Sequence, residues 1–247
     1  MVFMYINKSL KILSVKGKNF MSSGSCGKVY SKTDEQIIKT YFKETADLCK
    51  LNDDVFSIIK DIKSPNLIEI YDVYTSFLHY YKYLRGKTEF KVDAYAAKYY
   101  QETEKNVLRD SKEYLLENMY GLEKLVHELS NSAILVGDLS RENTIFTESN
   151  MVIVDPDLFS HSVLSFKENQ EENIIAYLDY IAFLFIDELI KEEKKYNRDY
   201  SKLKKQIFLE SIRIRKKIIG SDKSIVDEFS KVLRFHKSPM EFFTKGE

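Results

Sequence analysis

The chain has little that would crosslink it or draw it to a charged surface. Its 247 residues include two cysteines, Cys26 and Cys49, which cannot form a disulfide framework and belong to no Cys-x-x-Cys pair that would indicate zinc. The 38 Lys and Arg residues are balanced by 38 Asp and Glu residues, so no overall field attracts nucleic acid or an anionic membrane. The four histidines are scattered along the chain. We therefore expect no zinc site, no nucleic-acid partner and no membrane partner.

Long apolar runs are also missing. No uninterrupted run approaches the ~18 residues of a membrane-spanning helix. The first residues lack the apolar core and the small-residue cleavage site of a signal peptide. Together with the cysteine usage, which fits a reducing compartment, these absences predict a cytoplasmic protein. The content of 44% hydrophobic and 31% charged residues is that of an ordinary globular chain, long enough to bury a sizeable core.

The most informative stretch is residues 133–159, AILVGDLSRENTIFTESNMVIVDPDLF. Its apolar runs are rich in β-branched and aromatic residues and predict three short strands, at residues 134–136, 144–146 and 151–154. The first run leads to Asp138 and, five residues later, to Asn143, whereas the third run ends at Asp155. Because a polar turn reverses the chain between the second and third runs, we expect these three side chains to converge.

Two carboxylates and a carboxamide at one place suit a particular chemistry. Oxygen ligands such as Asn143 and Asp155 can hold Mg²⁺ on phosphate groups, while a separate carboxylate, Asp138, orients an attacking hydroxyl. The alternative interpretation is a β-hairpin whose turns happen to be acidic, since short motifs produce false positives.

At these residues the chain resembles the protein-kinase-like superfamily, whose catalytic loop is H-R-D-L-x-x-x-N and whose next strand ends in D-F-G. Residues 136–143 are VGDLSREN and residues 155–157 are DPD, so the spacing from Asp138 to Asn143 is kept while the flanking His, Arg, Phe and Gly are not. Gly137 before the aspartate is similar to the aminoglycoside, choline and fructosamine kinase branch. The resemblance implies binding of ATP and Mg²⁺ and phosphoryl transfer to a hydroxyl.

Two further landmarks of that family occur earlier in the chain. Residues 22–30, SSGSCGKVY, match the second and third glycines of G-x-G-x-x-G-x-V, and the resemblance implies that Gly24 and Gly27 cover the phosphates and Val29 covers the adenine. Ten residues after Val29, Lys39 lies on an apolar strand at residues 36–41, where the family has a lysine that pairs with the α and β phosphates. The alternatives are an ordinary glycine-serine turn and a lysine facing water.

The next segment departs from the family. Residues 45–63 have apolar side chains at three- and four-residue steps, which predicts an amphipathic helix on the sheet, and residues 64–68, SPNLI, follow it as in many kinases. The helix glutamate that should hold the phosphate-binding lysine falls at Val55. Asp54 could substitute for it if the helix is shifted. Without a partner for Lys39, a nucleotide-binding module without turnover is an open alternative.

The remaining pattern predicts further strands and then helices. We expect strands at residues 69–77 and 90–96, with an exposed strand or turn between them where aromatic and basic residues alternate; stacking of nucleobases there is the less favoured interpretation. The resemblance places a hinge at residues 95–99, where the backbone of Ala96 would meet the adenine. We expect helices at residues 102–108, 111–129, 173–190, 200–219 and 224–235. The charged connector at 191–198 is most simply a solvated helix end.

These features predict an α+β, two-lobed, protein-kinase-like fold. Residues 1–98 would form a small N-lobe with an antiparallel sheet and one helix, and residues 99–247 a larger, mostly helical C-lobe. The expected activity uses ATP and Mg²⁺, with Asp138 and Lys39 as catalytic residues and Asn143 and Asp155 as metal ligands. The expected enzyme is a protein Ser/Thr kinase-like phosphotransferase. A small-molecule kinase of the aminoglycoside or choline type and a pseudokinase scaffold are the alternatives.

Overall fold

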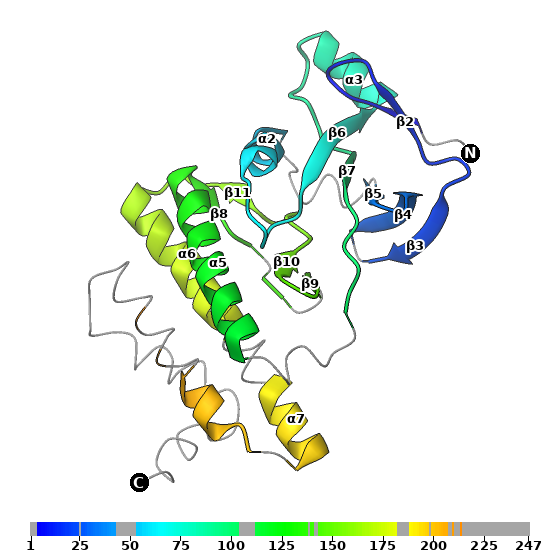
Figure 1. Ribbon diagram of the computed structural model, residues 1–247. Coiled ribbons are helices and arrows are strands. Elements are labelled where there is room, and N and C mark those ends of the chain that lie inside the picture. Colours follow the sequence, from blue (N-terminus) through cyan, green and yellow to red (C-terminus); the bar gives the residue numbers. More distant parts are fainter. Residues whose placement is uncertain are drawn as a thin grey trace.

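The computed structural model describes residues 4–24, 26–42, 53–103, 112–137, 139–140, 143–181, 188–197, 199–206, 209 and 213 (Figure 1). Within these residues the chain combines an antiparallel sheet from the first hundred residues with two small strand pairs and several helices. The expected mixed α+β class is confirmed. None of the helices in the described part of the chain has the length and apolarity needed to cross a bilayer.

The large sheet has seven antiparallel strands in the order β2-β1-β6-β7-β5-β4-β3. Their bounds are β1 Met4–Ile6, β2 Ile12–Ser14, β3 Asn19–Ser23, β4 Gly27–Thr33, β5 Gln36–Tyr41, β6 Ile70–Ser76 and β7 Ala94–Lys98. The strand β5 matches the expected range, whereas the sequence pattern does not predict β1. Because β5 and β7 lie in the interior of the sheet, both backbone edges of each are paired.

Helix α2, Asp53–Asp61, packs beside β6 and covers part of this sheet. Its buried residues, Val55, Phe56 and Ile59, recur at helical spacing, and the Phe56 ring lies 5.6 Å from that of Tyr95 in β7. The amphipathic helix expected at residues 45–63 is therefore confirmed for residues 53–61, and residues 45–52 lie outside the described residues.

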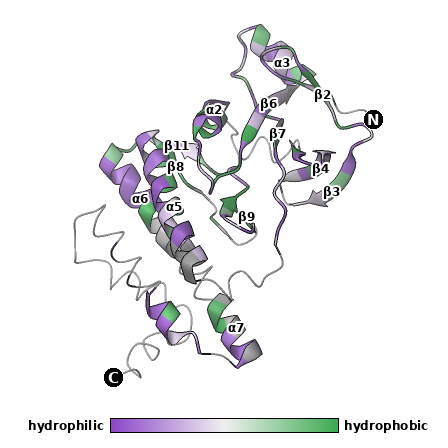
Figure 2. Ribbon diagram, viewed as in Figure 1, coloured by the Kyte–Doolittle hydropathy of each residue, from purple (hydrophilic) through white to green (hydrophobic). Residues whose placement is uncertain are grey.

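Helix α3, Phe77–Leu84, corrects the expectation of an exposed strand or turn after β6. Ser76 caps the helix by accepting a hydrogen bond from the backbone N–H of His79, and Asp93 accepts from the Ser76 N–H at 2.7 Å. On its inner side Tyr80 and Tyr83 pack against Ile6 and Phe90 from β1 and the stretch before β7. Figure 2 shows the hydrophobic residues of α3 in green. The alternating aromatic and basic residues therefore belong to a helix rather than a strand.

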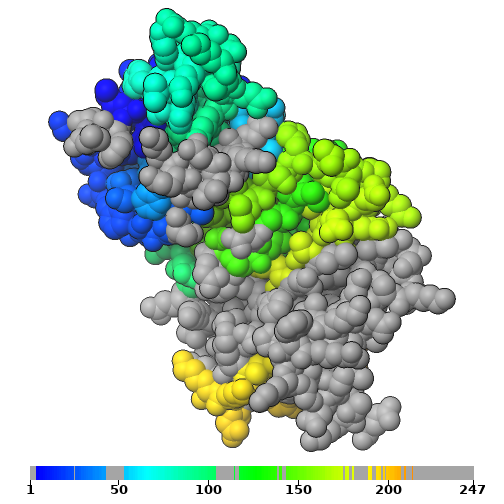
Figure 3. All heavy atoms as spheres, turned by 180° about the vertical axis from the view of Figure 1, so that it is seen from behind, coloured from blue at the N-terminus to red at the C-terminus, as the bar shows by residue number. Residues whose placement is uncertain are grey.

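The strands expected around the acidic motif are confirmed with small shifts. They are β8 Ile134–Leu135, β9 Thr144–Phe146 and β10 Met151–Ile153. A fourth strand, β11 Ser160–His161, was not predicted. β9 and β10 form an antiparallel hairpin, as the polar turn predicts, and β11 returns to pair with β8. Seen from behind, the residues of this region (green) lie next to those of the large sheet (blue and cyan) (Figure 3).

Two packed helices support these short strands. Helix α5, Lys112–Asn131, agrees with the expected range, but α6, Phe166–Ile181, begins seven residues before the expected start at residue 173. The early start has a local cause: Ser165 and Glu168 exchange hydrogen bonds with each other's backbone N–H groups, which is a capping box. The charged stretch expected at 191–198, interpreted as a solvated helix end, lies for residues 191–196 in helix α7, Glu188–Tyr196, as that interpretation predicts.

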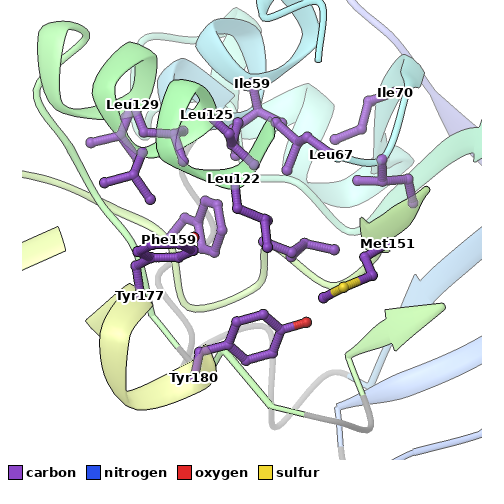
Figure 4. Packing of buried hydrophobic residues seen from close by; sticks show 14 of the residues in the cluster. Ile59, Leu67, Ile70, Leu122, Leu125, Leu129, Met151, Phe159, Tyr177 and Tyr180 are labelled. Atoms are coloured by element: carbon purple, nitrogen blue, oxygen red, sulfur yellow. The ribbon is translucent and has the colours of Figure 1, made fainter. Parts of the chain in front are cut away.

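Buried side chains from the sheet, α2, α5, α6 and the β9–β10 hairpin form one continuous hydrophobic cluster (Figure 4). A polar residue, Asn66, sits within it and donates from Nδ2 to the Asn118 Oδ1 and the Met151 carbonyl, each at 2.9 Å. Its backbone carbonyl accepts from the Ile153 N–H at 2.9 Å. Gly121 of α5 is required here, because a Cβ on it would lie 2.0 Å from the Asn66 Oδ1. These contacts fix β10, and hence the residues after it, against the segment that enters β6.

Candidate functional site

Lys39 lies near the middle of β5, in the interior of the sheet. It stands directly opposite Val29 of β4 and Tyr95 of β7, and residues opposite one another in an antiparallel pair share a face. Ile38, its neighbour, points to the other face, into a cluster with Tyr5 and Ala96. Lys39 itself is buried. The alternative of a lysine facing water is therefore wrong, and the buried ammonium requires anionic partners.

Those partners come from the segment that follows β10. The Lys39 Nζ lies 2.5 Å from the Asp155 Oδ2 and 2.6 Å from the Asp157 Oδ2. Asp155 and Lys39 are 116 residues apart in the chain. The structure thus brings together two of the residues that the sequence indicated, Lys39 and Asp155, and adds a third, Asp157.

A tyrosine completes the cluster. The Tyr41 hydroxyl, two residues after Lys39 on the same face of β5, donates a hydrogen bond to the Asp157 Oδ1. Both oxygens of Asp157 are therefore engaged, one by Lys39 and one by Tyr41. The Lys39 Nζ also lies 5.4 Å from the centroid of the Tyr41 ring. We refer to Lys39, Tyr41, Asp155 and Asp157 as the lysine cluster.

Burial controls the electrostatics of the lysine cluster. Loss of hydration raises the pKa of Asp157 to about 7, and the neighbouring Asp155 carboxyl group adds to this rise while the charge of Lys39 opposes it. Burial by itself would lower the pKa of Lys39, but the charges of Asp157 and Asp155 outweigh it, so the Lys39 pKa is raised. The pKa of Tyr41 is raised well above its usual value, chiefly by burial and then by Asp157. Tyr41 therefore acts as a neutral donor.

Asp155 differs from Asp157 in having a free oxygen. Its Oδ1 is buried but has no hydrogen-bond partner among the described residues, although its Oδ2 contacts Lys39. Asn143 is held nearby, because its carbonyl accepts from the N–H of Val154, the residue before Asp155, at 2.9 Å. A carboxylate oxygen and a carboxamide are ligands that suit Mg²⁺, which also keeps waters and phosphate oxygens, and this backbone contact brings Asn143 into the neighbourhood of Asp155. Among the described residues, no three His, Cys, Asp or Glu side chains form a metal-binding group of their own.

Asp138, the expected base, lies outside the described residues, but the residue before it is described. A Cβ on Gly137 would lie 2.3 Å from the carbonyl oxygen of Leu158. Leu158 lies just before β11, the strand that pairs with β8. An arginine could not occupy this position without moving that backbone. Close packing is thus the physical reason for Gly-Asp in place of Arg-Asp.

The glycine-rich stretch is a tight turn between β3 and β4, closed by a hydrogen bond from the Gly24 N–H to the Gly27 carbonyl at 3.0 Å. The turn is short because residues 21–23 belong to β3. A Cβ on Gly27 would lie 2.1 Å from the Thr40 carbonyl, so the packing of β4 on β5 explains this glycine. Gly24 has open space around its Cα and keeps its expected role as a candidate phosphate contact, and Val29 shares the face of Lys39.

Ala96 does not lie where we expected it. Its side chain points to the face opposite Lys39, and its backbone is paired with Ile38 on one side and Asp72 on the other, so it cannot present free backbone groups to a nucleotide. Its neighbour Ala97, opposite Ile37, lies on the face of Lys39 instead. A one-residue shift reverses the face of a strand residue, which explains the error.

Helix α2 offers Lys39 no glutamate, because Val55 is packed in the hydrophobic core. Asp54, the expected substitute, is exposed, and the carboxylates at Lys39 come instead from the segment after β10. Sequence reasoning missed Asp157 and Tyr41. One signal was present: each stands two residues from a recognised site residue, the spacing that places side chains on the same side of an extended chain.

Comparison with known proteins identifies no family for this chain, so its function is inferred from the geometry of the site. No protein-family model matches the chain, and no curated protein matches it at a significant level.

Proposed function

We propose that this protein is a phosphotransferase with a protein-kinase-like fold, which uses ATP and Mg²⁺ to phosphorylate a hydroxyl group. The observation that carries the proposal is the pairing of Lys39, on the interior strand β5, with Asp155, at the end of β10. A buried lysine beside a carboxylate with a spare oxygen is the arrangement that holds a nucleotide phosphate and its metal.

The order of landmarks along the chain supports the same conclusion. A glycine-containing turn, the lysine strand, one helix on the sheet, the Asp138-to-Asn143 loop and the strand ending in Asp155 follow one another as the family resemblance implies. Lys39 and Gly24 would contact the phosphates, and Val29 would cover the adenine. Asp155 and Asn143 would hold Mg²⁺, whose role when bound is to neutralise charge that develops on the transferred phosphoryl group.

Asp138 would serve the acceptor. A carboxylate at this position orients the hydroxyl and accepts its proton as the oxygen attacks the γ-phosphorus, and the bond to the β,γ-bridging oxygen breaks to leave ADP. Asp138 therefore acts in the transition state, not in the binding of ATP.

The segment between Asp155 and α6 bears on the acceptor. It spans residues 156–165, contains β11 and ends at the helix that begins with Phe166, whereas the sequence pattern had placed the start of that helix at residue 173. This leaves little chain with which to hold an extended peptide, and favours a small hydroxyl compound as acceptor. A protein serine or threonine is the second candidate, because the glycine turn and the SPNLI stretch resemble protein kinases.

The pseudokinase alternative rested on Val55 at the position of the helix glutamate and on the changed residues Pro156 and Asp157 after Asp155. The contacts of Lys39 with two carboxylates count against the first argument, because the ammonium has partners without help from α2. We therefore favour an enzyme over a scaffold.

The test compares Asp138→Asn with Asp155→Asn, using Asp61→Asn on the exposed side of α2 as the control. Asp138→Asn should leave ATP affinity in calorimetry nearly unchanged and lower phosphoryl transfer by about 10² to 10⁴, since it acts on the transition state. Asp155→Asn should remove the magnesium-dependent part of ATP binding.

Transfer is measured with labelled ATP, to protein acceptors and to a panel of amino sugars, amino alcohols and nucleosides. A parent protein that binds Mg²⁺ and ATP but transfers to none of these acceptors would restore the scaffold alternative. A parent protein that binds no ATP would refute the proposal.

A further inference from the structure

Lys39 contacts two carboxylates, and within the described part of the chain only Asp155 of these two has an oxygen left over for a metal. Resting on the proposed function, we propose that Asp157 is the positioning residue of Lys39. It takes the part of the missing helix glutamate and holds the ammonium towards the phosphates, while Asp155 serves the metal.

The two carboxylates differ in burial and in their partners. The Asp157 side chain is 5% exposed, against 26% for Asp155. Asp157 has both oxygens occupied by residues of β5, namely Lys39 and Tyr41, whereas the Asp155 Oδ1 has no partner among the described residues. Asp155 is thus the carboxylate that can bind a metal cation, and Asp157 is the one that remains bound to Lys39.

The backbone around Asp157 is also fixed. The N–H of Phe159 donates to the Pro156 carbonyl at 3.0 Å, which closes a turn around Asp157, and the next residues pair with β8. Gly137 packs against Leu158 from the other side. Because the backbone is fixed on both sides of Asp157, its carboxylate is a rigid partner for Lys39.

This arrangement has a consequence for regulation. A lysine held by a helix glutamate is correctly placed only when the helix is in position. Here the support and the metal ligand lie on one short segment, and Val55 on α2 supplies no charge. We therefore expect the placement of Lys39 to be independent of α2, so that a shift of this helix would not switch the site off.

The experiment is a double-mutant cycle on the affinity for Mg²⁺-ATP, measured by calorimetry, with Lys39→Met, Asp157→Asn and the pair. Asp157→Asn should weaken affinity about tenfold in the parent but less than about twofold in the Lys39→Met background, because it acts through Lys39. It should leave the magnesium concentration at half-saturation unchanged. Asp155→Asn, the matched contrast, should change that magnesium dependence instead.

Tyr41→Phe is a second variant that leaves both carboxylates unchanged. It removes only the hydroxyl that donates to Asp157. It should weaken affinity in the same direction by a smaller factor, and Asp157→Glu should recover part of the loss caused by Asp157→Asn. Equal losses from Asp157→Asn with and without Lys39, or a changed magnesium dependence in Asp157→Asn, would overturn the assignment. If the parent binds Mg²⁺-ATP and Asp157→Asn binds it equally well, this inference fails while the proposed function stands.

Discussion

Replacing Lys39 by methionine tests the electrostatics of the lysine cluster without any ligand. Methionine keeps much of the apolar volume but leaves the buried Asp157 without its cation. Removing one partner of a buried ion pair costs about 3–5 kcal/mol, because the remaining charge is uncompensated. Asp157 can escape part of this cost by staying protonated, which makes the penalty depend on pH.

The sign of that dependence follows from the pKa of Asp157, which is raised from 3.8 to about 7 in the folded protein. Because the folded state holds this proton longer than the unfolded state, the contribution of Asp157 to stability falls as pH rises from about 4 to about 7. Above about pH 7 Asp157 in the parent protein is ionised and paired with Lys39, so its contribution to stability no longer falls with pH. In Lys39→Met the folded protein keeps the proton on Asp157, so the free energy of unfolding continues to fall by about 1.4 kcal/mol per pH unit.

The difference between parent and Lys39→Met should therefore widen by about 2 kcal/mol from about pH 7 to about pH 8.5. Urea unfolding at the two pH values measures it, with the free energy of unfolding extrapolated to water. In the Asp157→Asn background the Lys39→Met penalty should not depend on pH over this range. A penalty that is the same at both pH values in the parent background would refute the reasoning.

Two further predictions concern the packing that places the site. Asn66→Ala should lower the free energy of unfolding by about 1–3 kcal/mol, since it leaves the buried Met151 carbonyl and Asn118 without their donor; a change below about 0.5 kcal/mol in urea unfolding would contradict this. Ser165→Ala should cost about 1 kcal/mol by removing the cap of α6, also measured by urea unfolding. The hydrogen bonds from Ser165 lower the pKa of Glu168, so the capping box stops stabilising the fold as pH falls through that pKa. The cost of Ser165→Ala should therefore shrink on acidification. A cost that grows instead would contradict this prediction.

The local pattern was enough to predict the strands that present the site. β5, β9 and β10 are short runs of β-branched or aromatic residues bounded by polar turns, so their propensity and their burial agree. The position of Lys39 within an apolar strand likewise indicated a buried ammonium. For α2, the three- and four-residue spacing of apolar residues predicted the packed face that residues 53–61 present.

Other features depended on contacts between distant segments. The aromatic residues of α3 suit a strand as well as a helix, and it is Asp93, far along the chain, that secures the Ser76 cap. Gly27 has an explanation only once β4 packs against the Thr40 carbonyl.

The partners of Lys39 show the same limit most clearly. A lysine on an apolar strand requires an anion if it is buried, but the strand does not say which one, because electrostatic pairing depends on distance in space and not on separation along the chain. Only the folding of the β10 segment against β5 brings Asp155 and Asp157 to the ammonium and leaves Val55 in the core. The sequence by itself placed a lysine on an apolar strand, and the tertiary structure decided that its ammonium is buried and which carboxylates hold it.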